Sequence, residues 1–286
     1  MRKKIMVGLV ASVALVLFGG WWLFLRDNAP PPPDLASAIE IASAAQATTT
    51  SLAVTTTFSA TTTTSPSTTT SLQEKDMTEL STTTRPMTEV TTVEEVTTPA
   101  GINGVWNVDT SIGSFGIDES TSSFVGFRIK EVLGRGIGEV TAVGRTPQVE
   151  GRINFSEGAL IEVEISADLR GLRTDRSSRD SKVQQALNTN EHPRALFILD
   201  EKIVLDGNEA ADVSVLGSLS VNGVLNPIQV QLQAQLVGEI MTVVGTFDIV
   251  LSDYEVEAPS APIVASVEDN AIVEVQLFFV EGSYLL

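Results

Sequence analysis

The 286-residue chain contains no cysteine and a single histidine. Without cysteine it forms no disulfide bond, carries no thiolate nucleophile and offers no thiolate ligand to a metal ion. One histidine excludes a site built from several imidazoles and leaves His192 as the one candidate base for a serine–histidine–aspartate triad. That residue directly precedes Pro193 in an expected turn, and no Gly-x-Ser-x-Gly nucleophile pattern occurs. The sequence therefore predicts that the chain is not an enzyme and that His192 lies in a turn and faces solvent. The catalytic alternative is a hydrolase that uses His192.

Basic residues are also scarce. The chain has 18 Lys and Arg against 36 Asp and Glu, which gives a net charge of −18. Because nucleic-acid binding needs a concentrated basic surface, this balance argues against a nucleic-acid partner, and also against tight binding to an anionic membrane face. A glycine-rich segment at 134–138 resembles a phosphate-binding loop, but it lies between expected strands and lacks the following helix. We predict a hairpin or a bulge there.

One long apolar run stands near the N-terminus. Residues 1–4 include Arg2, Lys3 and Lys4, and the uncharged run 5–25 follows. As a helix with a rise of about 1.5 Å per residue, this run is long enough to cross the ~30 Å hydrocarbon core of a bilayer. The basic flank is typical of a cytoplasmic end. The sequence predicts an uncleaved transmembrane signal anchor at 5–25, with the rest of the chain extracytoplasmic, in the cell envelope or periplasm; a cleaved signal peptide is the alternative.

Residues 26–100 are rich in proline, threonine and serine. They begin with a proline run at 30–33 and continue with threonine tracts such as 61–64. Such segments bury too little apolar surface to offset the entropy of ordering the backbone, so we predict a disordered linker with at most a short helix at 35–42. It is either a spacer that holds a domain off the membrane or a passive connection. Glycosylation of its threonines is a hypothesis from composition.

Residues 101–286 show the two-residue alternation of half-buried strands. Apolar residues alternate with polar ones at 161–169, 213–221, 228–236 and 273–279, and Gly, Asn, Asp and Pro separate these runs. The glutamine and glutamate faces are expected to point to water, the reverse of a membrane-spanning barrel. One apolar face across many antiparallel strands predicts a single all-β domain, either a closed barrel or a sandwich.

Four short motifs in order carry a family resemblance. They are the segment Trp106–Asp109, the strand Ser123–Ile129, the polar insert with Arg179-Asp180 before Pro193 and Phe197, and Gly217–Val224 followed by Pro227. In this order the segment from about Val105 onward resembles the YceI-like family. The resemblance implies an antiparallel lipocalin-like β-barrel that binds polyisoprenoid lipids without a catalytic step.

The resemblance implies a lipid-binding cavity, and the alternation supplies its inward residues. These are Val125, Phe127, Ile129, Val163, Ile165, Ala167, Leu169, Phe197, Val215, Leu219, Val230, Leu232, Phe247, Ile249, Val275 and Leu277. Small inward residues at 167, 217, 234 and 245 are expected to leave room inside. The expected ligand is a polyisoprenoid or an isoprenoid quinone, with no other cofactor and no metal. The alternative is a packed barrel that serves as a structural or adhesive module of the cell envelope.

A basic series recurs every three residues in the polar insert. Arg170, Arg173, Arg176, Arg179 and Lys182 are interleaved with aspartates. A helix is expected at 179–188, since Val183, Ala186 and Leu187 have the spacing of one helical face, and it would cover one barrel mouth. We predict that Arg173, Thr174, Asp175, Arg176, Arg179 and Asp180 form this mouth and meet a lipid head group, because guanidinium groups bind phosphates in a bidentate manner. Alternatively, the arginines pair with neighbouring acids and fix the loop. A dimer is compatible with this sequence.

Overall fold

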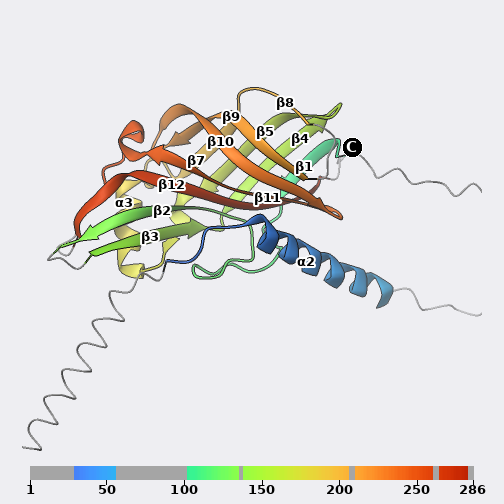
Figure 1. Ribbon diagram of the computed structural model, residues 1–286, viewed down its shortest axis with the longest axis horizontal. Helices are drawn as coiled ribbons and strands as arrows, with labels where there is room; N and C mark the ends of the chain where they lie inside the picture. Colours follow the sequence, from blue (N-terminus) through green and yellow to red (C-terminus); the bar gives the residue numbers. More distant parts are fainter. Residues whose placement is uncertain (1–28, 56–101, 135–137, 206–209, 260–263, 283–286) are drawn as a thin grey trace, which may run out of the picture.

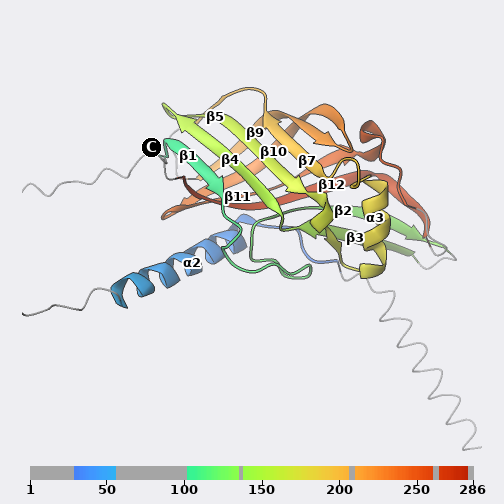
Figure 2. The ribbon, with the colours of Figure 1, turned by 180° about the vertical axis from the view of Figure 1, so that it is seen from behind.

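The computed structural model describes residues 29–55, 102–134, 138–205, 210–259 and 264–282, and its elements are shown in Figures 1 and 2. The helices are α2 (Leu35–Thr55) and α3 (Asp180–Ala186), with single 3-10 turns η1 (Leu169–Gly171), η2 (Ser177–Arg179) and η3 (Leu251–Tyr254). The strands are β1 (Gly104–Val108), β2 (Phe124–Leu133), β3 (Gly138–Thr146), β4 (Val149–Ser156), β5 (Ala159–Asp168), β6 (Arg173–Thr174), β7 (Arg194–Leu199), β8 (Ile203–Val204), β9 (Ala210–Val221), β10 (Val224–Val237), β11 (Ile240–Val250) and β12 (Val264–Glu281).

The strands form a closed antiparallel barrel. Strand β1 pairs with β4 on one side and with β12 on the other, so the order β1-β4-β5-β7-β9-β10-β11-β12 returns to its start. Strand β12 is long enough to pair with β2 along its first part and with β1 near its end, so β2, β3 and β6 extend the sheet at one end of the barrel. The predicted all-β antiparallel barrel with a short helix is confirmed. Strands β2 and β3 pair antiparallel as far as Leu133 and Gly138, and most of the glycine-rich segment between them lies outside the described residues.

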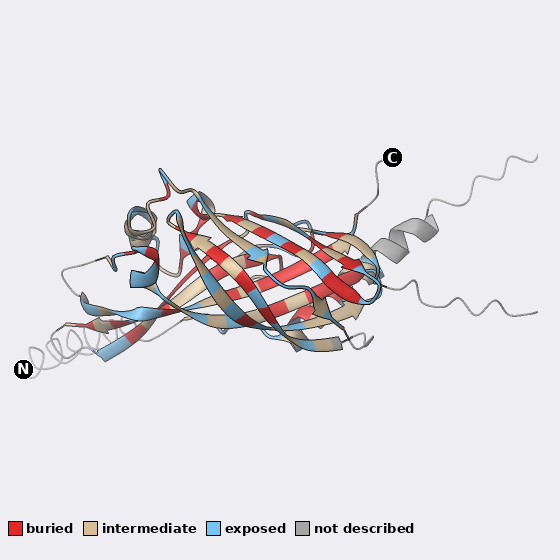
Figure 3. Ribbon diagram, turned by 90° about the horizontal axis from the view of Figure 1, so that it is seen from above, coloured by how far each residue is buried: buried red, intermediate tan, exposed pale blue. Residues whose placement is uncertain are grey.

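Alternation of burial along the strands separates the two faces of the barrel, as Figure 3 shows. On β5 the residues Val163, Ile165 and Ala167 are buried, as the pattern predicts. The alternation breaks at the start of this strand, where the register against β4 shifts. Leu160 is buried there and Ile161 is 43% exposed, the reverse of the expected order. A β-bulge adds one residue to one strand and therefore reverses the face of the residues beyond it.

The outer face of β12 is buried, which corrects the expectation that polar faces point to water. Glu274 and Phe278 are fully buried and Gln276 is 3% exposed. The expectation holds on β10, where Gln229 and Gln231 are exposed. The difference arises because the segment 29–48 and the loop that precedes β2 cover the outside of β12.

Helix α2 is the largest departure from the sequence interpretation, which allowed only a short helix at 35–42. Asp34 caps its N-terminus, since the Oδ1 atom of Asp34 accepts a hydrogen bond from the backbone N–H of Ser37 at 3.0 Å. That bond lowers the pKa of Asp34. Ala38 and Ala42 are fully buried against Ile240, Val244 and Phe278 on the outer face of the barrel. Tertiary packing thus adds to the helix propensity of the alanine-rich first part of α2 and stabilises a helix longer than the sequence predicted.

Two segments about which the sequence makes predictions lie outside the described residues. These are the proposed anchor at 5–25 and the linker beyond residue 55. Within the part of the chain that the structure describes, no helix is both long and apolar enough to span a bilayer.

The packing of α2 can be tested with a matched pair of substitutions. Ala42 is fully buried against the barrel, whereas Ala44 is exposed on the same helix. Burying an unpaired carboxylate is costly, so we expect Ala42→Asp to lower the free energy of unfolding by about 2–4 kcal/mol, and Ala44→Asp to change it by about 0.5 kcal/mol. Urea denaturation of both variants measures the difference. Equal values for the two variants would contradict the docking of α2.

Candidate functional site

The barrel interior holds two adjoining cavities. Their volumes are about 390 Å³ and about 160 Å³. The first lies at the end that carries α3, and the second extends toward the opposite end, where the β10–β11 hairpin lies. The two share the lining residues Val125, Ala195, Leu219 and Val273, so these side chains form the boundary between them.

The structure brings all of the predicted cavity residues together around this space. Val125 and Leu219 line both cavities. Phe127, Ile129, Leu169 and Ile249 line the first, and Val163, Ile165, Ala167, Phe197, Val215, Val230, Leu232, Phe247, Val275 and Leu277 line the second. The alternation along each strand carried this information, because residues two apart on one strand share a face. That these side chains contact a lipid stays a prediction.

Two of the small inward residues do not leave room as predicted. A methyl group at Gly217 would lie 2.4 Å from Cζ of Phe197, and one at Gly245 would lie 2.4 Å from Cδ2 of Leu232. Each glycine is therefore covered by a large side chain of the adjacent strand. The open space lies elsewhere, in the two cavities, the first of which is covered by α3.

The predicted mouth residues divide into two groups. Thr174, Arg176 and Arg179 line the first cavity. Arg173, Asp175 and Asp180 do not line it. Arg173 is exposed, Asp175 accepts a hydrogen bond from the backbone N–H of Val143 on β3, and Asp180 accepts one from the backbone N–H of Thr174.

Arg179 and the aspartates position the loop. The Nη2 atom of Arg179 lies 2.7 Å from Oε2 of Glu131, and its Nη1 atom lies 2.8 Å from Oδ1 of Asp175. The Oδ1 atom of Asp180 accepts hydrogen bonds from the backbone N–H of Thr174 at 2.9 Å and from its hydroxyl at 2.6 Å. Arg179 and Asp180 thus fix the geometry of the loop, as the alternative interpretation expects. Arg176 lines the first cavity, and its contact with a lipid head group stays a prediction.

Helix α3 closes the end of the barrel as predicted, although it is shorter than the expected 179–188. Val183, Ala186 and Leu187 line the first cavity. Ser178, which is exposed, belongs to the same lining, so the cavity reaches the surface beside η2.

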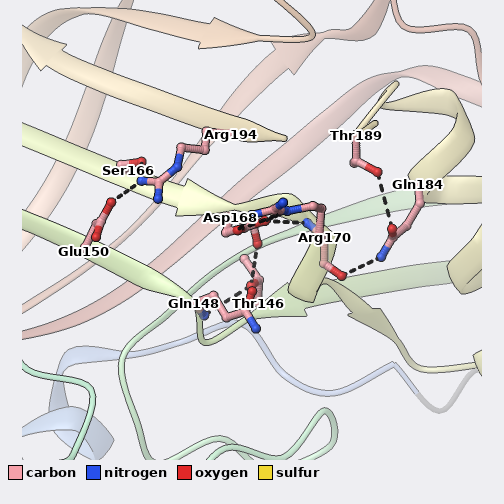
Figure 4. Close-up of polar contacts among 9 residues, drawn as sticks. All are labelled: Thr146, Gln148, Glu150, Ser166, Asp168, Arg170, Gln184, Thr189 and Arg194. Carbon is pink, nitrogen blue, oxygen red and sulfur yellow. Dashed lines mark hydrogen bonds and ion pairs between the residues drawn. The ribbon is translucent and has the colours of Figure 1, made fainter. Parts of the chain in front are cut away.

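Figure 4 shows how α3 is held against the end of β5. The Nε2 atom of Gln184 donates to the carbonyl of Arg170 at 2.8 Å, and the hydroxyl of Thr189 donates to Oε1 of Gln184 at 3.3 Å. Asp168 accepts from the backbone N–H of Arg170 at 2.9 Å and forms an ion pair with its guanidinium. The hydrogen bond from the Arg170 side chain is the main reason why the pKa of Asp168 is lowered.

Besides Ser178, sequence reasoning missed three polar residues of the first cavity. Glu131 has the same inward parity as Val125, Phe127 and Ile129, so the alternation contained the signal. Lys182 belongs to the basic series but was not assigned to the mouth. Tyr254 lies on η3, and burial raises the pKa of its hydroxyl. No strand alternation extends to Tyr254, because η3 ends the pattern of β11.

His192 lies away from the cavities. It follows α3 in a turn, and its ring packs over Gly223 in the β9–β10 hairpin, where a methyl group would lie 2.6 Å from Cε1 of His192. Gly223 and Asn222 both have positive φ values, as a tight Asn-Gly hairpin turn requires. The hydrophobic cluster beside this turn contains Leu219 and Tyr254. The position of His192 is that of a packing residue at the hairpin.

The solved structures that are similar to this chain include three from different organisms. BcnA of Burkholderia cenocepacia is 15% identical, and the match covers 60% of this chain and 98% of BcnA with a TM-score of 0.44. A polyisoprenoid binding domain of Saccharophagus degradans, implicated in plant cell wall breakdown, is 17% identical, and the match covers 63% of this chain and 99% of that domain with a TM-score of 0.46. The YCEI protein of Campylobacter jejuni is 17% identical, and the match covers 49% of this chain and 85% of that protein with a TM-score of 0.41. Comparison with curated proteins yields no match.

A family model gives the decisive comparison. The model of the YceI-like domain matches residues 115–279, which is more than half of the chain. The matched range runs from β2 to all but the last two residues of β12, and it includes the α3 segment that covers the first cavity. The chain is therefore a member of the YceI-like family.

Proposed function

We propose that the barrel binds one amphiphilic lipid non-covalently, with its tail in the two cavities and its head group at the end covered by α3. The observation that carries this proposal is a gradient of polarity along the interior. In the lining of the second cavity, as far as the structure describes it, Gln235 is the one polar side chain. The first cavity adds Glu131, Arg176 and Lys182 at its outer end. An apolar depth with a polar rim suits a molecule that has a long tail and a polar head.

The size and lining of the cavities support an isoprenoid as the tail. The first cavity, of about 390 Å³, falls within the range of roughly 300–1,000 Å³ that is typical of small-molecule sites. Each buried methylene contributes about 0.8 kcal/mol, so a long tail binds tightly with few polar contacts. One similar structure is described as a polyisoprenoid binding domain, and on this basis we assign a polyisoprenoid or an isoprenoid quinone as ligand. The presence of cavities favours this carrier role over a packed structural or adhesive module.

The proposed location follows from the N-terminal sequence. Residues 5–25 would anchor the chain in the cytoplasmic membrane, with the barrel on the extracytoplasmic side, since the basic residues precede the apolar run. A membrane-bound carrier of this kind would store, transfer or protect an isoprenoid lipid without a chemical step.

A matched pair on β9 tests the cavity. Leu219 lines both cavities, whereas Leu216 is 46% exposed on the outer face of the same strand. We expect Leu219→Trp to weaken isoprenoid binding at least tenfold, a change of about 1.4 kcal/mol, because the indole fills the boundary between the cavities. Leu216→Trp should leave binding unchanged.

The readout for this pair is titration with a fluorescent isoprenoid analogue. Since overpacking costs about 1–3 kcal/mol of stability, thermal unfolding is recorded for both variants, and Ala195→Leu serves as a milder block at the same boundary. Unchanged binding in folded Leu219→Trp and Ala195→Leu would contradict the proposal.

A second pair tests the rim. Arg176 and Lys182 line the first cavity, whereas Arg173 belongs to the same loop and does not. A hydrogen bond to a charged group contributes about 1.5–3 kcal/mol. We therefore expect Arg176→Ala with Lys182→Ala to weaken binding of an isoprenyl phosphate about tenfold or more, and Arg173→Ala to have little effect. Binding of an isoprenoid quinone measured in parallel shows whether the rim selects phosphate; equal effects of the two variants would contradict a head-group role.

A further inference from the structure

A buried carboxylate on the outside of the barrel joins two arginines. Glu274 is fully buried on β12. Its Oε2 atom lies 3.1 Å from Nε of Arg128 on β2, and its Oε1 atom lies 2.7 Å from Nε of Arg145 on β3. The guanidinium of Arg145 also stacks over the ring of Phe124, with 4.6 Å between Cζ and the ring centroid. These contacts orient both guanidinium groups on the outer face of the sheet.

The outer nitrogens of both arginines bind the N-terminal segment. Nη2 of Arg128 donates to the carbonyl of Pro30 at 2.8 Å, and Nη2 of Arg145 donates to the carbonyl of Pro31 at 2.8 Å. Consecutive prolines favour an extended backbone without internal hydrogen bonds, so their carbonyls remain available as acceptors. Pro30 is buried in this contact. We refer to Glu274, Arg128, Arg145 and the two proline carbonyls as the proline clamp.

Helix α2 continues the attachment beyond the clamp. Ala38 and Ala42 pack against Phe278, four residues after Glu274 on the same strand. Near the other end of the packed stretch, Nε2 of Gln46 donates to the carbonyl of Val237 at 2.7 Å. The chain from Pro30 to Gln46 is thus fixed to the barrel at both of its ends.

The clamp lies on the outside of the barrel, level with the inner part of the first cavity, because Glu274 directly follows Val273, which lines both cavities. Arg128 precedes Ile129, whose side chain lines the first cavity. In Figures 1 and 2 the blue segment that begins at residue 29 starts at the α3 end of the barrel, and α2 then leads away toward the opposite end. The chain therefore enters the folded domain beside the mouth.

The distance along the chain between the apolar run and the clamp is short. Five residue steps separate Leu25 from Pro30, and at about 3.3–3.6 Å per step they span at most about 18 Å. By contrast, residues 56–101 connect α2 to β1, and both of these elements belong to the folded domain. A spacer between membrane and barrel would have to lie before the clamp, where only a few residues are present.

We propose that the proline clamp holds the barrel against the bilayer that contains residues 5–25, with the mouth of the first cavity facing the lipid surface. The inference rests on the membrane anchor of the proposed function and specifies the source of its ligand, which is the bilayer itself. It replaces the interpretation of 26–100 as a tether that holds the domain off the membrane. A lipid would then pass between bilayer and cavity over a short distance.

Because the chain has no cysteine, single labels can be placed without background. Leu225 is 61% exposed at the α3 end, next to the β9–β10 hairpin, and Val204 is 73% exposed at the opposite end. A 14-residue strand such as β10 extends over about 45 Å, so the two labels lie roughly 30 Å apart along a tilted barrel. The full chain, labelled at Leu225→Cys or Val204→Cys, is reconstituted in vesicles of phosphatidylethanolamine and phosphatidylglycerol that contain an acceptor lipid. We expect strong energy transfer from position 225 and weak transfer from position 204.

Two insertions distinguish the clamp from a tether. Twenty Gly/Ser residues, which span roughly 25 Å as a coil, are placed either between Asn28 and Ala29 or between Thr70 and Ser71. We expect the first insertion to abolish most of the energy transfer from position 225, and the second to leave it unchanged. Equal transfer from both labels, or a loss with the second insertion as large as with the first, would overturn the proposal. Failure of the full chain to remain with the vesicles would overturn it as well.

Isoprenoid uptake is measured on the same samples to separate the two proposals. Uptake with no difference between the labels would contradict the orientation alone. A clear difference between the labels without uptake would support the orientation and contradict lipid binding.

Discussion

Closure of the barrel on β12 is the constraint on which the rest of the structure depends. This strand pairs with β11 along one edge and with β2 and then β1 along the other, so it completes the ring and leaves it without a free edge. Its inward residues Val275 and Leu277 line the second cavity, while Glu274 and Phe278 face outward and are buried. A strand with both faces buried needs a cover on each side. The cover on the outside is the segment 29–48 together with the loop before β2, which explains why a chain portion far from β12 in sequence belongs to the barrel domain.

Two charged clusters with different surroundings perform different tasks. Glu274 lies between two arginines outside the barrel, and each arginine completes its hydrogen bonding on a proline carbonyl. Glu131 lies inside, where it pairs with Arg179 and so holds the loop that carries Arg176. Removing one partner of a buried ion pair is costly because it leaves an uncompensated charge, so both clusters specify where a segment attaches. One fixes the N-terminal segment, and the other fixes the rim of the cavity.

Much of the fold and of the cavity lining was predictable because side chains alternate between the two faces of a strand with a period of two residues. Val163 and Ile165, or Val275 and Leu277, share a face whatever the tertiary structure, and closing the sheet turns that face inward. Ile161 was predicted on the wrong face because a shift in register depends on the partner strand. The burial of Glu274 depends on Arg128 and Arg145, which come from two other strands, and no local pattern links them. Helix α2 was predicted only over its first part, at 35–42, because the contacts of its buried alanines with the barrel have no signal in the local sequence.

The central claim is that the interior holds an isoprenoid lipid, and lipid mass spectrometry tests it most directly. The full chain, rather than residues 101–286 alone, is purified under native conditions from its own host, because the segment 29–48 covers the barrel. We expect one isoprenoid species in stoichiometric amount, and its loss when Leu219 at the boundary of the two cavities is replaced by tryptophan. A folded protein that carries no lipid and takes up no isoprenoid in vitro would contradict this claim.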